Sequence, residues 1–176
     1  LEVRHAGGGY YPVSLPEGVM RFHMTRRTLT PITANNSASL FALEGNLRLV
    51  EFHSKANALT DESMEIVAAA AADHGKGIII HNDAQHFSAG VDLNAFRAYI
   101  EAEDWDGIDG FLDRFQKAVC ALKYTPVPVV GAPSGLAAGG GYEVLAHCDR
   151  LVVHTNSVMG LVEAGVGVVP GGGGIK

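Results

Sequence analysis

Two short apolar runs, each with helix-like segments beside it, constrain the fold of this chain more than any other feature. They are GIIIHN at residues 77–82 and VPVVGAP at residues 127–133. Neither shows the alternation of apolar and polar residues that is typical of a strand with one solvated face. Such runs are typical of strands that are buried on both faces of a sheet. A third strand, RLVVHT, is expected at residues 150–155.

Helical patterns fill the intervals between these strands. Residues 61–75 predict a helix that Thr60 can N-cap, with acidic residues in the first turn and Gly75 at its end. Residues 93–104 and 105–125 carry apolar side chains at helical spacing, and another helix is expected to run to about His147. This order of strands and helices predicts an α/β fold with parallel strands and crossover helices.

The first 38 residues differ in composition from the rest of the chain. They are rich in Gly, Pro, Ser, Thr and Asn and show no sustained apolar period, so we expect a linker or the tail of a preceding domain over residues 1–38. Residues 39–45 and 46–52 then read as two strands on either side of a Gly45-Asn46 turn, which predicts a β-hairpin. The main domain is therefore expected over residues 39–176.

Charge and composition exclude several classes of function. A net charge of −6 with scattered basic residues argues against a nucleic-acid surface, which needs clustered Lys and Arg. Cys120 and Cys148 lack CxxC spacing, and none of the eight histidines has metal-ligand spacing to another, so no metal is expected. No apolar run approaches membrane-spanning length and no signal peptide is visible, so we expect a cytoplasmic protein without a membrane span.

Three successive glycines precede a predicted helix in GLAAGGGYEVLAHCD, residues 135–149. A sharp turn between strand and helix explains such glycines in most proteins. Phosphate-loop spacing and the GxSxG pattern of a serine nucleophile are both absent. The alternative is an anion site made of backbone N–H groups at a helix start, which would stabilise a thioester oxygen as it becomes an enolate. The loop HFSAGVD, residues 86–92, could supply a second donor.

Four ordered motifs together resemble the crotonase (enoyl-CoA hydratase/isomerase) superfamily: HSKANAL at 53–59, FSAGVDL at 87–93, GLAAGGGYE at 135–143 and GLVEAGVGVVPGGGG at 160–174. The resemblance implies a ββα spiral core over residues 39–176. It covers about the first two thirds of a crotonase domain, which implies a C-terminally truncated form without the helices that complete the fold and its trimer. Residues 1–38 resemble the end of the dehydrogenase part of bacterial bifunctional 3-hydroxyacyl-CoA dehydrogenase/enoyl-CoA hydratases.

The resemblance also implies a set of site residues. The oxyanion hole would consist of the N–H groups of Val91 and Gly140, and the N–H of Gly171 would help to hold the catalytic water. Coenzyme A would be bound as part of the substrate, with no separate cofactor, and the chain would form a homo-oligomer based on trimers. The adenine-ribose end of coenzyme A would lie along Lys55, Ala56 and Asn57, with the backbone of Ala89 and Asp92 nearby. A turn after a strand explains the first three nearly as well.

Two glutamates complete the hydratase pattern that the resemblance implies. Glu143 stands two residues after the glycine triplet, and Glu163 follows twenty residues later. Syn addition of water to a 2-enoyl thioester needs a base for the water that attacks C3 and an acid for the proton at C2. Two neighbouring carboxyl groups can hold different protonation states, because like charges push their pKa values apart. We assign Glu143 to the water and Glu163 to the proton.

The sequence therefore predicts an enoyl-CoA hydratase, a lyase that converts 2-enoyl-CoA to 3-hydroxyacyl-CoA in fatty-acid β-oxidation. Two alternatives stay open at this point. One is a Δ3,Δ2-enoyl-CoA isomerase with the same fold, although isomerases of the superfamily typically work with one acidic residue, so the pair of glutamates favours hydration. The other is a non-catalytic module for coenzyme A binding or assembly.

Overall fold

The computed structural model describes residues 2–19 and 21–175, which fall into two compact units. The first unit extends to Thr30 and the second begins at Pro31. In the first, β1 (Glu2–Arg4) pairs antiparallel with β2 (Tyr10–Pro12), and the short helix α1 (Phe22–Arg26) follows. All residues of β1 and β2 are exposed, so this hairpin contributes no buried core.

A six-stranded sheet forms the second unit, in the order β3-β4-β5-β6-β7-β9. The strands are β3 (Pro31–Ala34), β4 (Ala38–Leu43), β5 (Leu47–Phe52), β6 (Ile78–Ile80), β7 (Val129–Gly131) and β9 (Arg150–Leu151). From β5 to β9 every neighbouring pair is parallel, which confirms the predicted α/β pattern. The antiparallel pairing of β4 with β5 confirms the hairpin, and Gly45 and Asn46 in its turn both have positive φ.

The sheet begins earlier than the boundary expected at Ser39. Residues 31–34, which the sequence placed in the linker, form the edge strand β3 and pair antiparallel with β4. Every residue of β3 is exposed, so the strand carries no apolar period that would reveal it in the sequence. Pro31 occupies its first position, where a missing N–H costs little at a sheet edge.

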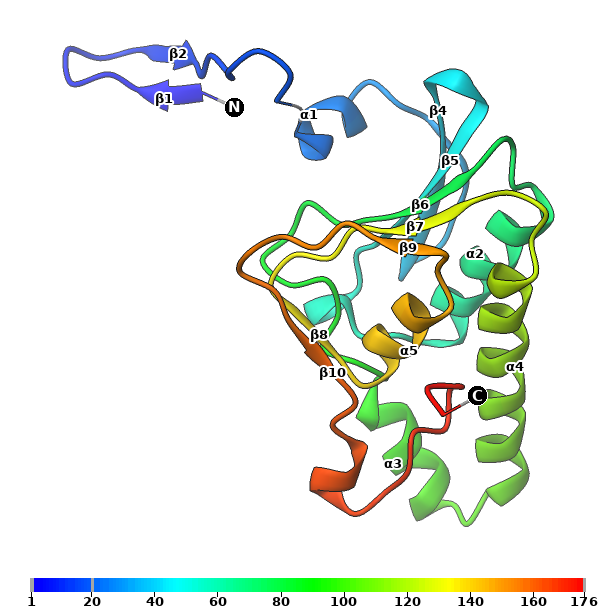
Figure 1. The fold of residues 1–176 in the computed structure, drawn as a ribbon. Coiled ribbons are helices and arrows are strands. Elements are labelled where there is room, and N and C mark those ends of the chain that lie inside the picture. Colours follow the sequence, from blue (N-terminus) through cyan, green and yellow to red (C-terminus); the bar gives the residue numbers. More distant parts are fainter. Residues whose placement is uncertain (1, 20, 176) are drawn as a thin grey trace. The chain divides into compact units, whose positions relative to one another are not determined.

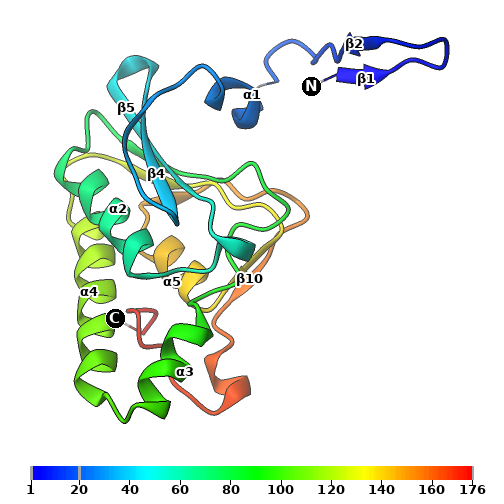
Figure 2. The ribbon, with the colours of Figure 1, turned by 180° about the vertical axis from the view of Figure 1, so that it is seen from behind.

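Four further helices belong to this unit: α2 (Asp61–Ala72), α3 (Leu93–Glu101), α4 (Trp105–Lys123) and α5 (Gly140–Ala146). The start of α2 is the one predicted, since Thr60 accepts from the backbone N–H of Ser63 and the Ser63 hydroxyl accepts from Thr60 in a capping box. Helix α2 packs against α4 and against β4 and β5. Both views show α2 and α4 side by side on one side of the sheet (Figures 1 and 2).

The hydrophobic core lies between the sheet and these helices. Ile78 and Ile80 are at most 1% exposed, as expected for a strand buried on both faces. Four apolar residues at helical spacing along α4 are all buried, namely Phe111, Phe115, Val119 and Leu122. The helical spacing in the sequence therefore identified the face of α4 that packs on the core.

A second, two-stranded parallel sheet and three short 3-10 turns were not predicted. The strands are β8 (Leu136–Ala138) and β10 (Val158–Gly160), and the turns are η1 (Glu44–Asn46), η2 (Lys55–Asn57) and η3 (Glu163–Val166). Strand β8 leads directly into α5, so it places the glycine triplet at the end of a strand. The glycine triplet therefore lies at a turn between a strand and a helix, although the strand before it was not predicted.

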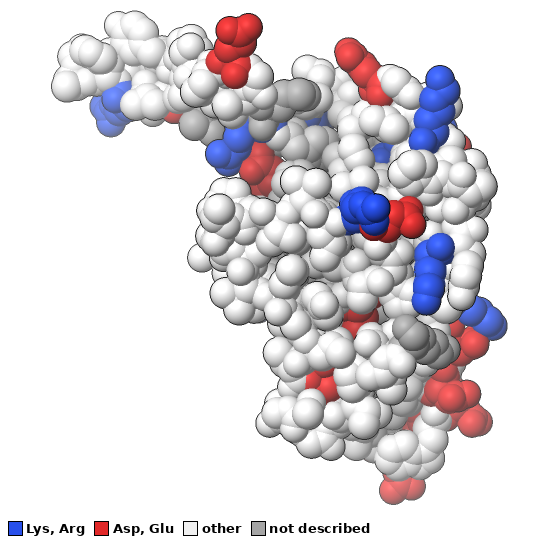
Figure 3. Space-filling view, in the orientation of Figure 1, with Lys and Arg blue, Asp and Glu red and all other residues white. Residues whose placement is uncertain are grey.

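The surface of the second unit is unevenly charged. Acidic side chains gather at the lower right of Figure 3, around the connection from α3 to α4, where Glu101, Glu103 and Asp104 are exposed. A polyanionic ligand would be repelled from that end. Among the described helices, none is long and apolar enough to cross a membrane.

Candidate active site

The glycine triplet at residues 139–141 meets constraints that a larger residue could not. Gly139 has φ 50 and ψ −121, and a Cβ atom on it would lie 2.9 Å from Oε1 of Glu163. A Cβ atom on Gly140 would lie 2.8 Å from Cγ2 of Val91, closer than real Cβ atoms approach. The glycines therefore allow both the left-handed turn into α5 and the close approach of the loop that contains Val91.

The N–H groups of Val91 and Gly140 lie close together in this turn. Leu59 donates to the carbonyl of Gly90 and accepts from the N–H of Asp92, so the intervening N–H of Val91 is left out of this parallel bridge. Gly140 is the first residue of α5, where backbone N–H groups have no helical acceptor. Within the described residues, neither N–H donates to a protein acceptor. The pair can stabilise an oxygen that gains negative charge.

Glu143 lies in the first turn of α5 and is 2% exposed. Its Oε1 accepts the backbone N–H of Gly174 at 2.9 Å. Burial raises the pKa of this carboxyl, the N–H of Gly174 opposes that rise, and the negative charge of Glu163 raises the pKa further. A carboxylate with a raised pKa is a stronger base, which suits it to accept a proton from water.

Glu163 is the first residue of η3, and its carboxyl group lies beside Gly139, at the start of the glycine triplet. Its Oε2 is buried and has no hydrogen-bond partner in the described part of the protein. A buried carboxyl oxygen without a partner costs free energy, so this oxygen is available to a ligand in the site. The negative charge of Glu163 acts on Glu143, so the two carboxyl groups lie close enough to interact.

The loop at residues 171–174 packs against the Glu143 carboxyl group. Gly171 is held by Gln116 of α4, whose Nε2 donates to the Gly171 carbonyl at 2.7 Å. A Cβ atom on Gly172 would lie 2.6 Å from Oε2 of Glu143, so only a glycine fits there. Figures 1 and 2 both show this last part of the chain between α4 and α5. The water-holding role of the Gly171 N–H stays a prediction.

The residues expected to bind coenzyme A lie on η2 and on the loop that faces it. Lys55 and Ala56 are exposed, and the N–H of Ala89 donates to the carbonyl of Ala56 at 3.2 Å. Asn57 is buried, and its Nδ2 donates to the carbonyl of His86 at 2.8 Å. The Asn57 amide therefore connects the two loops. The exposed surface is formed by Lys55, Ala56 and Ala89.

Asp92 connects this region to the oxyanion pair. Its carboxylate accepts from the N–H of Asn94 at 2.9 Å and caps the start of α3. Its own N–H donates to Leu59, two residues after Asn57. The bridge between residues 59 and 91 thus brings the expected coenzyme A surface beside the two N–H donors.

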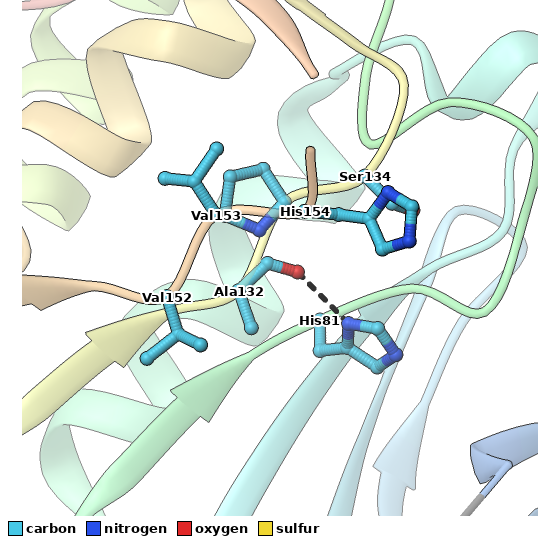
Figure 4. A pocket seen from close by; sticks show the side chains of 7 residues that line it. His81, Ala132, Ser134, Val152, Val153 and His154 are labelled. Atoms are coloured by element: carbon cyan, nitrogen blue, oxygen red, sulfur yellow. Dashed lines mark hydrogen bonds between the residues drawn. The ribbon is translucent and has the colours of Figure 1, made fainter. Parts of the chain in front are cut away.

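A separate cavity of about 350 Å³ opens where β6, β7 and β9 end (Figure 4). His81 and His154 lie at one side of it, and Nδ1 of His81 lies 2.8 Å from the carbonyl oxygen of Ala132. None of the predicted site residues lines it; the lining is His81, Ala132, Pro133, Ser134, Val152, Val153 and His154. No three His, Cys, Asp or Glu side chains of the described residues gather as a metal site requires.

Two residues of the site were missed by the sequence analysis. Gln116 holds the 171–174 loop, and the buried His147 contacts Glu143 through the backbone. The absence of metal-ligand spacing among the histidines assigned no role to His147. Its position four residues after Glu143, one helical turn, was the signal that could have identified it.

Comparison with protein families gives a match over residues 44–176 to the family described as Enoyl-CoA hydratase/isomerase. A Bacillus subtilis (strain 168) protein named "Probable 3-hydroxyacyl-CoA dehydrogenase" is 33% identical over 168 residues, 93% of this chain and 21% of that protein. The mouse (Mus musculus) protein named "Methylglutaconyl-CoA hydratase, mitochondrial" is 36% identical over 90 residues, 51% of this chain and 27% of that protein. The chain thus spans about a fifth of the Bacillus relative's length.

Solved structures agree on the fold. The Pseudomonas aeruginosa protein DspI superposes with a TM-score of 0.71 at 25% identity, covering 80% of this chain and 55% of that one. An enoyl-CoA hydratase from Polaromonas sp. JS666 gives a TM-score of 0.71 at 22% identity, covering 77% of this chain and 55% of that one. The predicted spiral core is therefore confirmed by structural neighbours.

Proposed function

Because the chain belongs to the enoyl-CoA hydratase/isomerase family, we propose that it adds water to a 2-enoyl-CoA thioester and yields the 3-hydroxyacyl-CoA. One observation carries this proposal: the N–H groups of Val91 and Gly140, which have no acceptor among the described residues, lie beside two carboxyl groups that act on each other. The donors suit an enolate oxygen, and the carboxyl pair suits the two proton transfers that hydration needs.

The first part of the mechanism is stabilisation of the enolate. As the water oxygen bonds to C3, the electron pair of the double bond moves towards the thioester, and negative charge builds on the thioester oxygen. Two N–H groups aimed at that oxygen stabilise the charge, and the start of α5 adds its positive end. Removal of one such donor in other enzymes costs about 10²–10³ in kcat.

The second part is a pair of proton transfers. Glu143, ionised, takes one proton from the attacking water, and the hydroxyl that remains forms the new bond to C3. Glu163, protonated, gives its proton to C2, so one water is added overall and no group is lost. Turnover leaves Glu143 protonated and Glu163 ionised, and one proton must pass back between them before the next cycle. The assignment of the two roles follows the hydratase pattern, and the raised pKa of Glu143 means that its carboxylate, once ionised, takes up the water proton readily.

We also propose that the adenine-ribose end of coenzyme A lies along Lys55, Ala56 and Ala89. These residues are exposed, share one surface, and lie beside the oxyanion pair through the bridge between residues 59 and 91. The Lys55 ammonium would then face a phosphate of the substrate. The names of relatives in fatty-acid oxidation, such as "Fatty acid oxidation complex subunit alpha" of Idiomarina loihiensis, support the same pathway for this protein.

Association of several copies is part of the proposal. A continuous segment exposes large apolar side chains that a single copy leaves in water. They are Val152, Val153, Val158, Met159, Leu161, Val162, Val166, Val168 and Val169. Figure 3 shows few charged side chains on the face that includes β9 and β10.

The proposed function is tested by assays on 2-enoyl-CoA and 3-enoyl-CoA substrates. Crotonyl-CoA and a longer 2-enoyl-CoA should lose the absorbance of the conjugated thioester as they are hydrated. A 3-enoyl-CoA distinguishes the isomerase, because isomerisation would create that absorbance. Conversion of the 3-enoyl-CoA without hydration would overturn the proposal in favour of isomerisation, and coenzyme A binding without either reaction would indicate a non-catalytic module.

A further inference from the structure

His147 sits at the end of α5, one turn after Glu143, and is 4% exposed. Its Nδ1 lies 2.7 Å from the carbonyl oxygen of Glu143. A carbonyl only accepts, so Nδ1 carries the proton in this bond. The backbone N–H of His147 donates to Val144 instead, which leaves the Glu143 carbonyl to the ring. The ring is therefore fixed in orientation by the helix that carries the proposed base.

The opposite edge of the ring faces the 171–174 loop. Nε2 of His147 is buried and has no hydrogen-bond partner among the described residues. A Cβ atom on Gly173 would lie 3.0 Å from Cε1 and 3.3 Å from Nε2 of this ring. Gly173 also has φ 118, which side-chain-bearing residues rarely adopt. The loop can lie against the ring only because Gly173 has no side chain.

The same loop supplies the hydrogen bonds that hold the Glu143 carboxylate. The N–H of Gly174 donates to Oε1 at 2.9 Å, and the N–H groups of Gly172 and Gly173 also act on this carboxyl. On its α4 side the loop is tied by the bond from Gln116 to Gly171. On the α5 side the loop bonds to Glu143 and packs against the His147 ring, so removing the ring would take away the packing contact that supports this bond.

We propose that His147 is a positioning residue whose ring seats the 171–174 loop so that the loop's N–H groups reach the Glu143 carboxylate. This inference rests on the proposed function, in which Glu143 acts as the base. His147 does not touch the reacting atoms in this scheme. The ring acts through the loop, and the bond from Nδ1 keeps the ring in place.

Removal of the ring should change the protonation of Glu143 in a defined direction. N–H groups that bond a carboxylate favour its ionised form, so their loss raises its pKa. Glu163 and His147 are the two titratable side chains beside Glu143, and only His147 is altered. In His147→Ala the acidic limb of the pH profile of kcat should move up by about one pH unit for one lost N–H bond. KM for crotonyl-CoA should stay within about twofold.

Two further variants separate the ring from its hydrogen bond. His147→Phe keeps a ring beneath Gly173 and loses the donor to Glu143, whereas His147→Asn keeps a donor near the Nδ1 position and loses the ring. If the proposal holds, the acidic limb of the pH profile of kcat in His147→Phe stays near its position in the unaltered protein. In His147→Asn it moves up as it does in His147→Ala. Val67→Ala, a core truncation on α2, is the control for loss of packing alone, and its pH limb should not move.

A direct titration keeps this inference separate from the proposed function. The carboxyl carbon of Glu143, assigned by comparison with Glu143→Gln in 13C-Glu-labelled protein, reports its pKa by NMR whether or not the protein hydrates enoyl-CoA. A pKa of Glu143 that rises in His147→Ala and His147→Asn, but not in His147→Phe or Val67→Ala, supports the proposal. An unchanged pKa in His147→Ala, or an equal rise in all four variants, overturns it.

Discussion

The backbone nitrogen of Val91 lies 3.4 Å from the position that a Cβ atom on Gly140 would take. These residues come from two loops that are 49 positions apart in the sequence, one before α3 and one before α5. Their close approach brings together two N–H donors that have no acceptor in the described part of the chain. The second glycine of the triplet is therefore the position where a single methyl group should test the oxyanion pair most directly.

Gly140→Ala should lower kcat for hydration by about 10²–10³, the usual scale for loss of one oxyanion donor. The added methyl would meet Cγ2 of Val91 at 2.8 Å, so the two N–H groups must move apart. The infrared stretch of the thioester carbonyl in bound enoyl-CoA should shift back towards its value in water. Gly160→Ala is the control, because a Cβ atom there meets nothing within 4 Å. An unchanged carbonyl stretch in Gly140→Ala would refute the role of the triplet.

Glu143→Gln and Glu163→Gln should each reduce kcat for hydration by at least about a hundredfold, since each removes one of the two proton-transfer groups. Binding of a 3-hydroxyacyl-CoA, measured by calorimetry, should change little, because the amide has nearly the same shape as the carboxyl group. Glu65→Gln, at an exposed position of α2, is the matched control and should keep full activity. Near-normal turnover in either site variant would show that the assignment of the pair is wrong.

Glu143→Gln should make the fold more stable at pH 8. Burial, with the charge of Glu163, raises the pKa of the Glu143 carboxyl above its ordinary 4.5, so the folded state binds this proton more tightly than the unfolded state. The stability contributed by this group is therefore present below the unfolded pKa and is lost as pH rises through the folded pKa. Glutamine avoids that loss, so Tm should rise by about 2–4 °C for each kcal/mol added to the free energy of unfolding.

This gain should disappear at pH 3, well below the ordinary 4.5 of the carboxyl, where the group is protonated in both states. Scanning calorimetry of Glu143→Gln and Glu65→Gln at the two pH values measures it. Equal Tm values for Glu143→Gln and the unaltered protein at pH 8 would contradict a raised pKa.

Lys55→Ala should raise KM for crotonyl-CoA about two- to fivefold and leave kcat unchanged, since one exposed ion pair contributes at most about 1 kcal/mol. The difference should shrink at 0.5 M salt because exposed charges are screened. Lys76→Ala, at an exposed lysine between α2 and β6, should leave KM as it was. A loss in kcat with unchanged KM would remove Lys55 from the coenzyme A surface.

The elements with a strong local signal could be predicted from the sequence alone. Ile78 and Ile80 marked a strand buried on both faces, and Thr60 marked the start of α2. Each signal lies within a few residues, because hydrophobic period and capping are properties of neighbouring positions. Strand β3 gave no signal, since all of its residues are exposed, and the pairing of β8 with β10 joins residues 22 positions apart.

By itself the sequence determined the kinds of residue available to the site and their order: glycines before a helix start, then Glu143, then Glu163 after another loop. Only the tertiary structure decided that Glu143 is buried, that the 171–174 loop bonds to it, and that the His147 ring lies against that loop. The physical reason is the distance along the chain over which each property is determined. Backbone conformation follows from nearby residues, whereas burial, pKa and the meeting of two N–H groups depend on how distant segments pack.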